Sequence, residues 1–158
     1  MSIEGVRSYL KRWDRDGDII EMAASTATVI EAACALGVIP ARIAKSISLK
    51  QGDGAMVVVT AGDMKLDNRK YKDHFGFKAK MLSAEDALQI TGHAVGGVCP
   101  FGLPHGVEVF LDISMKRFDT VFPACGSSNS AIELTLDELH AYSQNKAWVD
   151  VCKPIAEA

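Results

Sequence analysis

The sequence predicts an α/β fold in which one mixed β-sheet is surrounded by helices. Segments with strand-like alternation and segments with helical spacing follow each other irregularly along the chain. Gln51-Gly-Asp-Gly54 has the composition of a hairpin turn, so the strands on either side of it are expected to be antiparallel neighbours. A doubly wound parallel sheet would need a more regular alternation of strands and helices. The 158 residues suit a single domain, which we expect to span residues 1–158.

The first half of the chain begins with apolar residues at helical spacing, which predict an amphipathic helix. Ser25 suits the N-cap of a second helix, and Gly37 suits its left-handed C-terminal stop. Three successive valines in the strand after the hairpin turn indicate burial on both of its faces. The expected elements are a helix over residues 2–13, a turn over 14–18, a strand over 19–22, a helix over 25–36, and strands over 43–49 and 55–60.

The second half contains two serine or threonine residues followed three positions later by an acidic residue, Ser83 with Asp86 and Thr135 with Glu138. This spacing is typical of a capping box at a helix start. Between the helices, residues 92–106 carry five glycines and two prolines, which predicts a long irregular loop. The expected elements are helices over 67–75 and 84–91, strands over 107–112 and 119–124, a sheet segment over 132–134, a helix over 135–142 and a strand over 148–151.

Composition excludes several classes of protein. The four cysteines are far apart and form no C-x-x-C pair, which is typical of reduced thiols in a cytosolic protein. The histidines show no metal-ligand spacing, so we expect neither a metal nor another cofactor. The first twenty residues carry mixed charges unlike a signal peptide, and no apolar run approaches the ~20 residues of a membrane helix. We therefore expect a cytoplasmic protein without a membrane partner.

The charge pattern limits how the chain could bind nucleic acid. The net charge is −3, whereas proteins that grip nucleic acid over a whole surface are usually basic. Residues 65–80 are a local exception, with six lysines and arginines against two aspartates. Such a segment can contact phosphates, although the same pattern also suits a helix face that is simply solvated.

Lys45 is the first candidate functional residue. Along a strand, side chains alternate between two faces, so Lys45 falls in the apolar row of Ile43, Ile47 and Leu49. A buried ammonium is costly unless it is paired. One interpretation is a cationic anchor for an anionic ligand in a cleft. The other is a lysine that extends to solvent or protects an edge strand.

The second candidate is the glycine loop, which we define as Gly96–Pro100. Glycines let a backbone approach a ligand closely, and free N–H groups in such a loop can stabilise an oxyanion. The loop matches neither the phosphate-loop nor the dinucleotide-binding pattern. An ordinary surface loop is the alternative.

Two further candidates follow from residue type. Gly126-Ser-Ser-Asn-Ser130 gathers hydroxyls and an amide that could bind a ribose or a phosphate, although such residues are also common in turns. Cys99 could act as a nucleophile with His93 or His105 as its base, but sequence spacing does not show whether either histidine reaches it.

Three segments in order resemble one family. Ala41-Arg-Ile-Ala-Lys-Ser46 resembles its lysine strand, and Val95-Gly-Gly-Val-Cys-Pro100 resembles its G-x-x-x-P loop. Gly126-Ser, followed by Ile132-Glu-Leu134 and the Thr135-Leu-Asp-Glu-Leu139 helix, resembles its C-terminal signature. The family is the YbaK/EbsC group, which is similar to the editing domain of bacterial prolyl-tRNA synthetases. The resemblance spans roughly residues 20–145.

The resemblance implies a curved mixed sheet and hydrolysis of the ester that joins a mismatched amino acid to tRNA. Its implied partners are the tRNA acceptor end and an aminoacyl-tRNA synthetase. It implies catalytic roles for Lys45, near the terminal adenosine and its phosphate, and for Gly96 and Pro100 of the loop. The substrate-binding residues that it implies are Glu21, Gly97, Val98, Cys99, Ser127 and Ser128. Two positions depart from the family: Cys99 replaces a small hydroxyl residue, and Glu21 lies where aromatic and histidine residues are common.

The sequence thus favours a freestanding deacylase that acts on mischarged tRNA carrying a small amino acid, with tRNA-Pro as one candidate. An aminoacyl ester is already activated, so positioning and oxyanion stabilisation count for more than a strong protein nucleophile. The alternative is a non-catalytic module of the same fold that binds tRNA or a synthetase.

Overall fold

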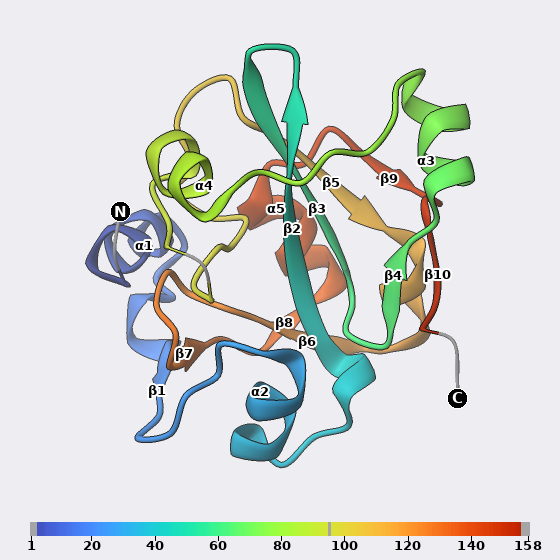
Figure 1. The fold of residues 1–158 in the computed structure, drawn as a ribbon. Coiled ribbons are helices and arrows are strands. Elements are labelled where there is room, and N and C mark those ends of the chain that lie inside the picture. Colours follow the sequence, from blue (N-terminus) through green and yellow to red (C-terminus); the bar gives the residue numbers. More distant parts are fainter. Residues whose placement is uncertain (1–2, 95, 156–158) are drawn as a thin grey trace.

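The computed structural model describes residues 3–94 and 96–155. A curled six-stranded sheet with the order β8-β6-β2-β3-β5-β9 forms the centre, and two short pairs, β1-β7 and β10-β4, are separate from it (Figure 1). The strands are β1 (Ile20–Glu21), β2 (Ile43–Gln51), β3 (Gly54–Ala61), β4 (Met64–Leu66), β5 (Glu108–Asp112), β6 (Thr120–Pro123), β7 (Ser130–Ala131), β8 (Leu134–Thr135), β9 (Ala147–Val149) and β10 (Cys152–Pro154).

The α-helices are α1 (Ile3–Leu10), α2 (Val29–Leu36), α3 (Asn68–Phe75), α4 (Ala84–Thr91) and α5 (Leu136–Ser143), with short 3₁₀ segments at Lys11–Trp13, Asp16–Asp18, Pro40–Arg42 and Ile113–Arg117. They lie around the sheet, as the sequence predicts (Figure 1). In the described part of the chain, every helix is too short or too polar to cross a bilayer.

The pairing of the strands confirms a mixed sheet. β2 and β3 form the predicted antiparallel hairpin. β2 runs parallel to β6, β3 parallel to β5, and β5 parallel to β9, while β6 and β8 are antiparallel. The long parallel connections bring segments that are distant in the sequence to neighbouring positions on β2.

Helix starts follow the predicted capping chemistry, with one correction. Asp67, Ser83 and Thr135 are N-caps of α3, α4 and α5. Helix α2 does not begin at Ser25, however. Thr28 is its N-cap and forms a reciprocal capping box with Glu31. Ser25 Oγ instead accepts a bond from the backbone N–H of Ala27 at 3.2 Å, so residues 25–28 form a polar turn before the helix.

The least accurate predictions concern short strands. Residues 132–133 lie between two strands rather than in one, because β7 pairs with β1 while β8 pairs with β6. The last predicted strand is shorter and begins one residue earlier, as β9. The strands β4 and β10, which pair with each other and have three residues each, were not predicted from the sequence.

Both faces of the central hairpin are buried. Val57 and Val59 of β3 contact the largest apolar cluster, together with Phe101 and Leu111. The alternating residues Met56 and Val58 belong to a second cluster on the opposite face, with Tyr71 and Val151. The valine run therefore indicates two-sided burial correctly. Consequently, neither side-chain row of β2 faces solvent, although only the row of Ile43, Lys45, Ile47 and Leu49 was predicted to face the core.

The outer edge of β2, on the side away from β3, is paired over only part of its length. Residues 43–44 pair with β6. Further along, the N–H of Lys50 donates to the carbonyl of Lys80 (2.8 Å), and the N–H of Leu82 donates to the carbonyl of Ser48 (3.2 Å). Within the described residues, positions 45–47 have no strand partner on this edge. We call this interruption the edge gap.

Candidate functional site

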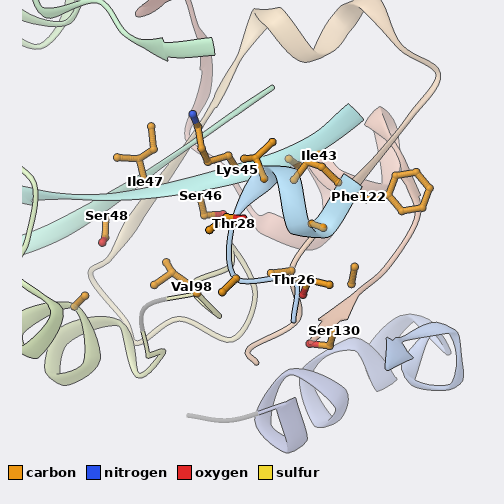
Figure 2. A pocket seen from close by; sticks show the side chains of 18 of the residues that line it. Thr26, Thr28, Ile43, Lys45, Ser46, Ile47, Ser48, Val98, Phe122 and Ser130 are labelled. Atoms are coloured by element: carbon orange, nitrogen blue, oxygen red, sulfur yellow. The ribbon is translucent and has the colours of Figure 1, made fainter. Parts of the chain in front are cut away.

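A cavity of about 290 Å³ lies at the edge gap (Figure 2). Its walls come from β2, from the turn before α2, from the glycine loop after α4 and from the chain around β6 and β7. Most of the side chains are small or apolar. The lining residues are Thr26–Val29, Ala32, Ile43–Ser48, Met81, Leu82, Ala87, Gly96, Val98, Phe122, Ala124, Ser130 and Ala131.

The glycine loop meets the predicted polar segment, residues 126–130, by close backbone packing. Gly96 has a φ of +91°, and a Cβ atom there would lie 3.0 Å from Ala27 Cβ. A Cβ atom at Gly97 would lie 2.9 Å from the carbonyl carbon of Gly126 and from the nitrogen of Ser127. Only residues without a side chain allow this approach. The structure therefore brings together two of the three sequence segments, and Gly96 and Val98 also line the cavity.

Several of the lining residues carry hydroxyl groups. Thr26 is 6% exposed, and its Oγ1 has no hydrogen-bond partner within the described residues. Ser46 of β2 is half-buried, but its Oγ is shielded from solvent and likewise has no partner there. Ser130 Oγ differs because it lies 2.6 Å from Ser127 Oγ. Among the described lining residues, Lys45 is the only charged one.

Lys45 lies beside the cavity, but its ammonium group is directed elsewhere. Figure 2 shows Lys45 and Ile47 on one side of β2, and Ser46 and Ser48 on the side that faces Val98. Lys45 Nζ donates to the carbonyl of Met64 at 2.5 Å. Burial lowers the pKa of Lys45, an effect that the neighbouring Cys152 and Asp63 partly offset. The predicted alternation is thus confirmed, and the amine is held by β4.

Cys99 is fully buried and does not line the cavity. Its Sγ lies 3.6 Å from His93 Nε2 and 3.7 Å from the carbonyl oxygen of Phe101. Burial raises the pKa of the Cys99 thiol to about 12 and lowers the pKa of His93. Near neutral pH the pair is therefore a neutral thiol beside a neutral imidazole, which argues against a nucleophilic cysteine.

Two other predicted residues lie away from the cavity. Pro100 lines a second hollow of about 560 Å³, together with His105, on a different part of the surface. Glu21 is exposed, and its Oε1 accepts a hydrogen bond from Arg7 Nη2 at 2.5 Å. Val95, the first residue of the predicted loop motif, lies outside the described residues.

The remaining predicted residues hold the walls together. Ser127 Oγ donates to Asn129 Oδ1 (3.0 Å), and Asn129 Nδ2 donates to the carbonyl of Met22 (3.0 Å). The carbonyl of Ser128 accepts a bond from the N–H of Thr26 at 2.6 Å. These bonds connect the 126–130 segment to residues 22 and 26, before α2. Ser127 and Ser128 therefore hold two walls of the cavity together and do not line it themselves.

Sequence reasoning missed Thr26 and Ser46 as lining residues. Ser46 lies in the side-chain row that the analysis did not identify as facing the core, and Thr26 lies in the segment that was expected to be helical. The run of valines in β3 was the available signal, because a hairpin with both faces covered leaves no solvent-facing row on β2. The six basic side chains of residues 65–80 are all exposed, which fits either predicted role of that segment.

Comparison with known proteins identifies the family of the chain. Residues 23–142 match the family model of the aminoacyl-tRNA editing domain. The chain is 55% identical to the uncharacterized protein YwhH of Bacillus subtilis (strain 168), over 97% of this chain and 98% of YwhH. It is 33% identical to the proline–tRNA ligase of Bacillus licheniformis over 58% of this chain. That match covers 16% of the ligase, so it concerns one part of the larger protein.

Solved structures show the same architecture. One described as a proposed trans-editing enzyme for prolyl tRNA synthetase superposes with a TM-score of 0.85, at 27% identity, over 96% of both chains. The hypothetical protein APE2540 superposes with a TM-score of 0.79 at 26% identity, over 92% of this chain and 99% of that one. The family model covers most of the chain and the fold agrees over nearly all of it. The resemblance drawn from three short motifs is confirmed, and the chain belongs to the aminoacyl-tRNA editing domain family.

Proposed function

We propose that the chain is a freestanding deacylase that hydrolyses the ester of tRNA mischarged with a small amino acid, and that residues 1–158 act as one editing domain. The observation that carries the proposal is the cavity at the edge gap, with its small lining side chains and with Gly96 and Val98 of the glycine loop in its wall. A volume of about 290 Å³ suits an aminoacyl group but not a large folded ligand.

The proposed reaction needs positioning more than a protein nucleophile. Water adds to the ester carbonyl, the bond between that carbon and the ribose oxygen breaks, and the ribose oxygen takes up a proton. The negative charge that develops on the carbonyl oxygen needs N–H donors. The N–H of Gly97 already donates to the carbonyl of Ala94 (2.9 Å). We assign the donor role to the N–H of Val98, the neighbouring residue that lines the cavity.

Lys45 is proposed to bind the phosphate of the terminal adenosine. It is the one charged residue among the described lining residues, and its side chain has rotatable bonds that let the ammonium exchange the Met64 carbonyl for a phosphate oxygen. Gly96 and Pro100 are proposed to fix the course of the loop, while Ser127 and Ser128 support it. The tRNA acceptor end is the proposed partner, and a synthetase could deliver it.

One observation favours a second candidate, a binding module without turnover. No carboxylate, imidazole or thiol is among the described residues that line the cavity, and the Lys45 ammonium is already bonded to a carbonyl. Such a module would retain tRNA without hydrolysing its ester.

A panel of tRNAs charged with different amino acids tests both candidates. We expect the protein to release at least one small amino acid, and Lys45→Ala to lower kcat/KM for that substrate about 10- to 100-fold, as for loss of a charge-assisted bond. Lys146→Ala is the matched control, because Lys146 lies beside β9 at the far edge of the sheet. If the wild type releases no amino acid from tRNA faster than the Lys45→Ala variant does, the deacylase proposal fails. Retention of tRNA without release supports the binding module.

A further inference from the structure

The backbone of Ser46 points into the edge gap. The N–H of Lys50 and the carbonyl of Ser48 point to this edge of β2, because they bond to residues 80 and 82 at 2.8 and 3.2 Å. In a strand, the N–H and C=O groups of every second residue point to the same edge. The pairing of β2 with β3 is unbroken over residues 44–51, so no bulge shifts this alternation. The N–H and the carbonyl of Ser46 therefore both point outward at the gap.

Neither of these two groups has a backbone partner within the described residues. The pairing with β6 ends at Ala44, and the bonds to residues 80–82 involve Ser48 and Lys50 only. Ser46 lines the cavity and is half-buried, whereas its Oγ is shielded from solvent. The accessible surface of Ser46 therefore belongs to its backbone and Cβ atoms. The polar groups that Ser46 offers to a ligand are its N–H and its carbonyl.

The length of the gap limits what can pair with Ser46. From Ala44 to Ser48, β2 rises by about 13 Å, and both ends of this stretch are already occupied, by β6 and by residues 80–82. A peptide strand needs several residues to form a ladder, so it does not fit between them. An aminoacyl group is short enough. It carries one amino group and one carbonyl group, separated by one carbon atom as in a single strand residue.

The polar groups of an aminoacyl ester also need the partners that Ser46 can supply. Its α-amino group needs an acceptor, since an unpaired ammonium group in a cavity is costly, and no carboxylate is among the described lining residues. Its ester carbonyl needs N–H donors when water adds and negative charge develops on the oxygen. Two residues on neighbouring antiparallel strands exchange both N–H···O bonds in this manner.

We propose that Ser46 binds the aminoacyl group through its backbone. The Ser46 carbonyl accepts a hydrogen bond from the α-amino group, and the Ser46 N–H donates to the ester carbonyl oxygen. The inference rests on the proposed deacylase function and adds a second oxyanion donor to Val98, which the Ser46 side of β2 faces in Figure 2. Because only backbone and α-amino groups take part, the pairing is the same for every small primary amino acid that enters the cavity.

The first test removes only the N–H of residue 46. In vitro translation with lactic acid gives Ser46→Ala in which an ester oxygen replaces this N–H, and ordinary Ser46→Ala is its partner. Ser46→Ala should leave kcat nearly unchanged, because the serine Oγ is shielded. The ester should lower kcat about 100-fold relative to it, as for the loss of one oxyanion donor. The same pair at Lys50 is the matched control, because the Lys50 N–H bonds to the carbonyl of Lys80, and its two members should have equal kcat.

The second test changes the substrate and needs no variant. The aminoacyl-tRNA hydrolysed fastest by the wild type is compared with its analogue that lacks the α-amino group, such as alanyl- with propionyl-tRNA. Each kcat/KM is divided by the rate of spontaneous hydrolysis, because the α-amino group itself activates the ester. We expect the normalised value to be about 10- to 100-fold lower without the α-amino group, as for loss of a charge-assisted bond.

A thermal melt establishes that each variant is folded, and the substrate pair decides alone if the ester at position 46 is not. Equal kcat for the two forms of Ser46→Ala, or equal normalised values for the two substrates, overturns the inference while the deacylase function stands. A folded Ser46→Ala protein without activity overturns it as well, because the side chain then has the role assigned to the backbone. If the wild type hydrolyses no aminoacyl-tRNA at all, the proposed function falls and this inference falls with it.

Discussion

Replacing Gly97 with alanine should destabilise the protein by pushing two backbone segments apart. The added Cβ would lie 2.9 Å from the carbonyl carbon of Gly126 and from the nitrogen of Ser127. Real Cβ atoms essentially never come this close, and backbone cannot rotate away as a side chain can. Overpacking of this kind costs about 1–3 kcal/mol. For a chain of 158 residues this corresponds to a fall in Tm of roughly 2–12 °C.

Gly17→Ala is the matched control, because an added Cβ there meets nothing within 4 Å. Calorimetry or urea unfolding of the two variants measures the difference in stability. The deacylation rate should fall further in Gly97→Ala than its stability alone explains, since Gly96 and Val98 on either side line the cavity. If both variants have the same Tm, the close packing of the glycine loop on residues 126–127 does not exist in solution.

Three further predictions concern single side chains. Burial holds the Lys45 pKa below its usual value of about 10.4, so the unfolded chain binds more protons between the two values. The wild type should therefore gain stability relative to Lys45→Met as the pH rises through that window, and parallel urea-unfolding profiles would contradict this. Cys99→Ala should keep deacylation within about twofold, because a buried thiol with its pKa raised to about 12 is not a thiolate. In the native protein, iodoacetamide should label the exposed Cys34 before the three buried cysteines. A Cys99→Ala protein that is folded but inactive would instead support Cys99 as the nucleophile. Thr28→Ala should cost about 0.5–2 kcal/mol by removing the N-cap of α2. Ser25→Ala should cost less, and equal costs in urea melts would show that the cap was misassigned.

Much of the fold could be predicted because it depends on local chemistry. The hairpin turn at residues 51–54 and the caps at Asp67, Ser83 and Thr135 are all encoded within a few residues. The strands β4 and β10 could not be predicted in this way. Each has three residues and is stabilised by pairing with a segment more than 80 positions away, so neither carries an alternation pattern of its own.

The candidate site shows the same division. The glycines at 96 and 97 mark a place of close backbone approach, and their partner segment at 126–130 was singled out by its hydroxyls. The position of Lys45 relative to the cavity could not be predicted, because alternation assigns residues to two rows without telling which row faces a ligand. Which row faces the ligand depends on the position of the cavity. The cavity is bordered by the parallel strand β6 and by residues 80–82, and both reach the edge of β2 from distant parts of the sequence.

The edge gap in β2 determines which segments of the fold a bound ligand would stabilise. An unpaired strand edge is a template for another chain, and here it is bordered by β6 on one side and residues 80–82 on the other. An aminoacyl group seated between them would contact both β6 and residues 80–82, which border the edge gap on its two sides. Amide hydrogen exchange in β6 and in residues 80–82 should therefore slow together when a substrate analogue binds.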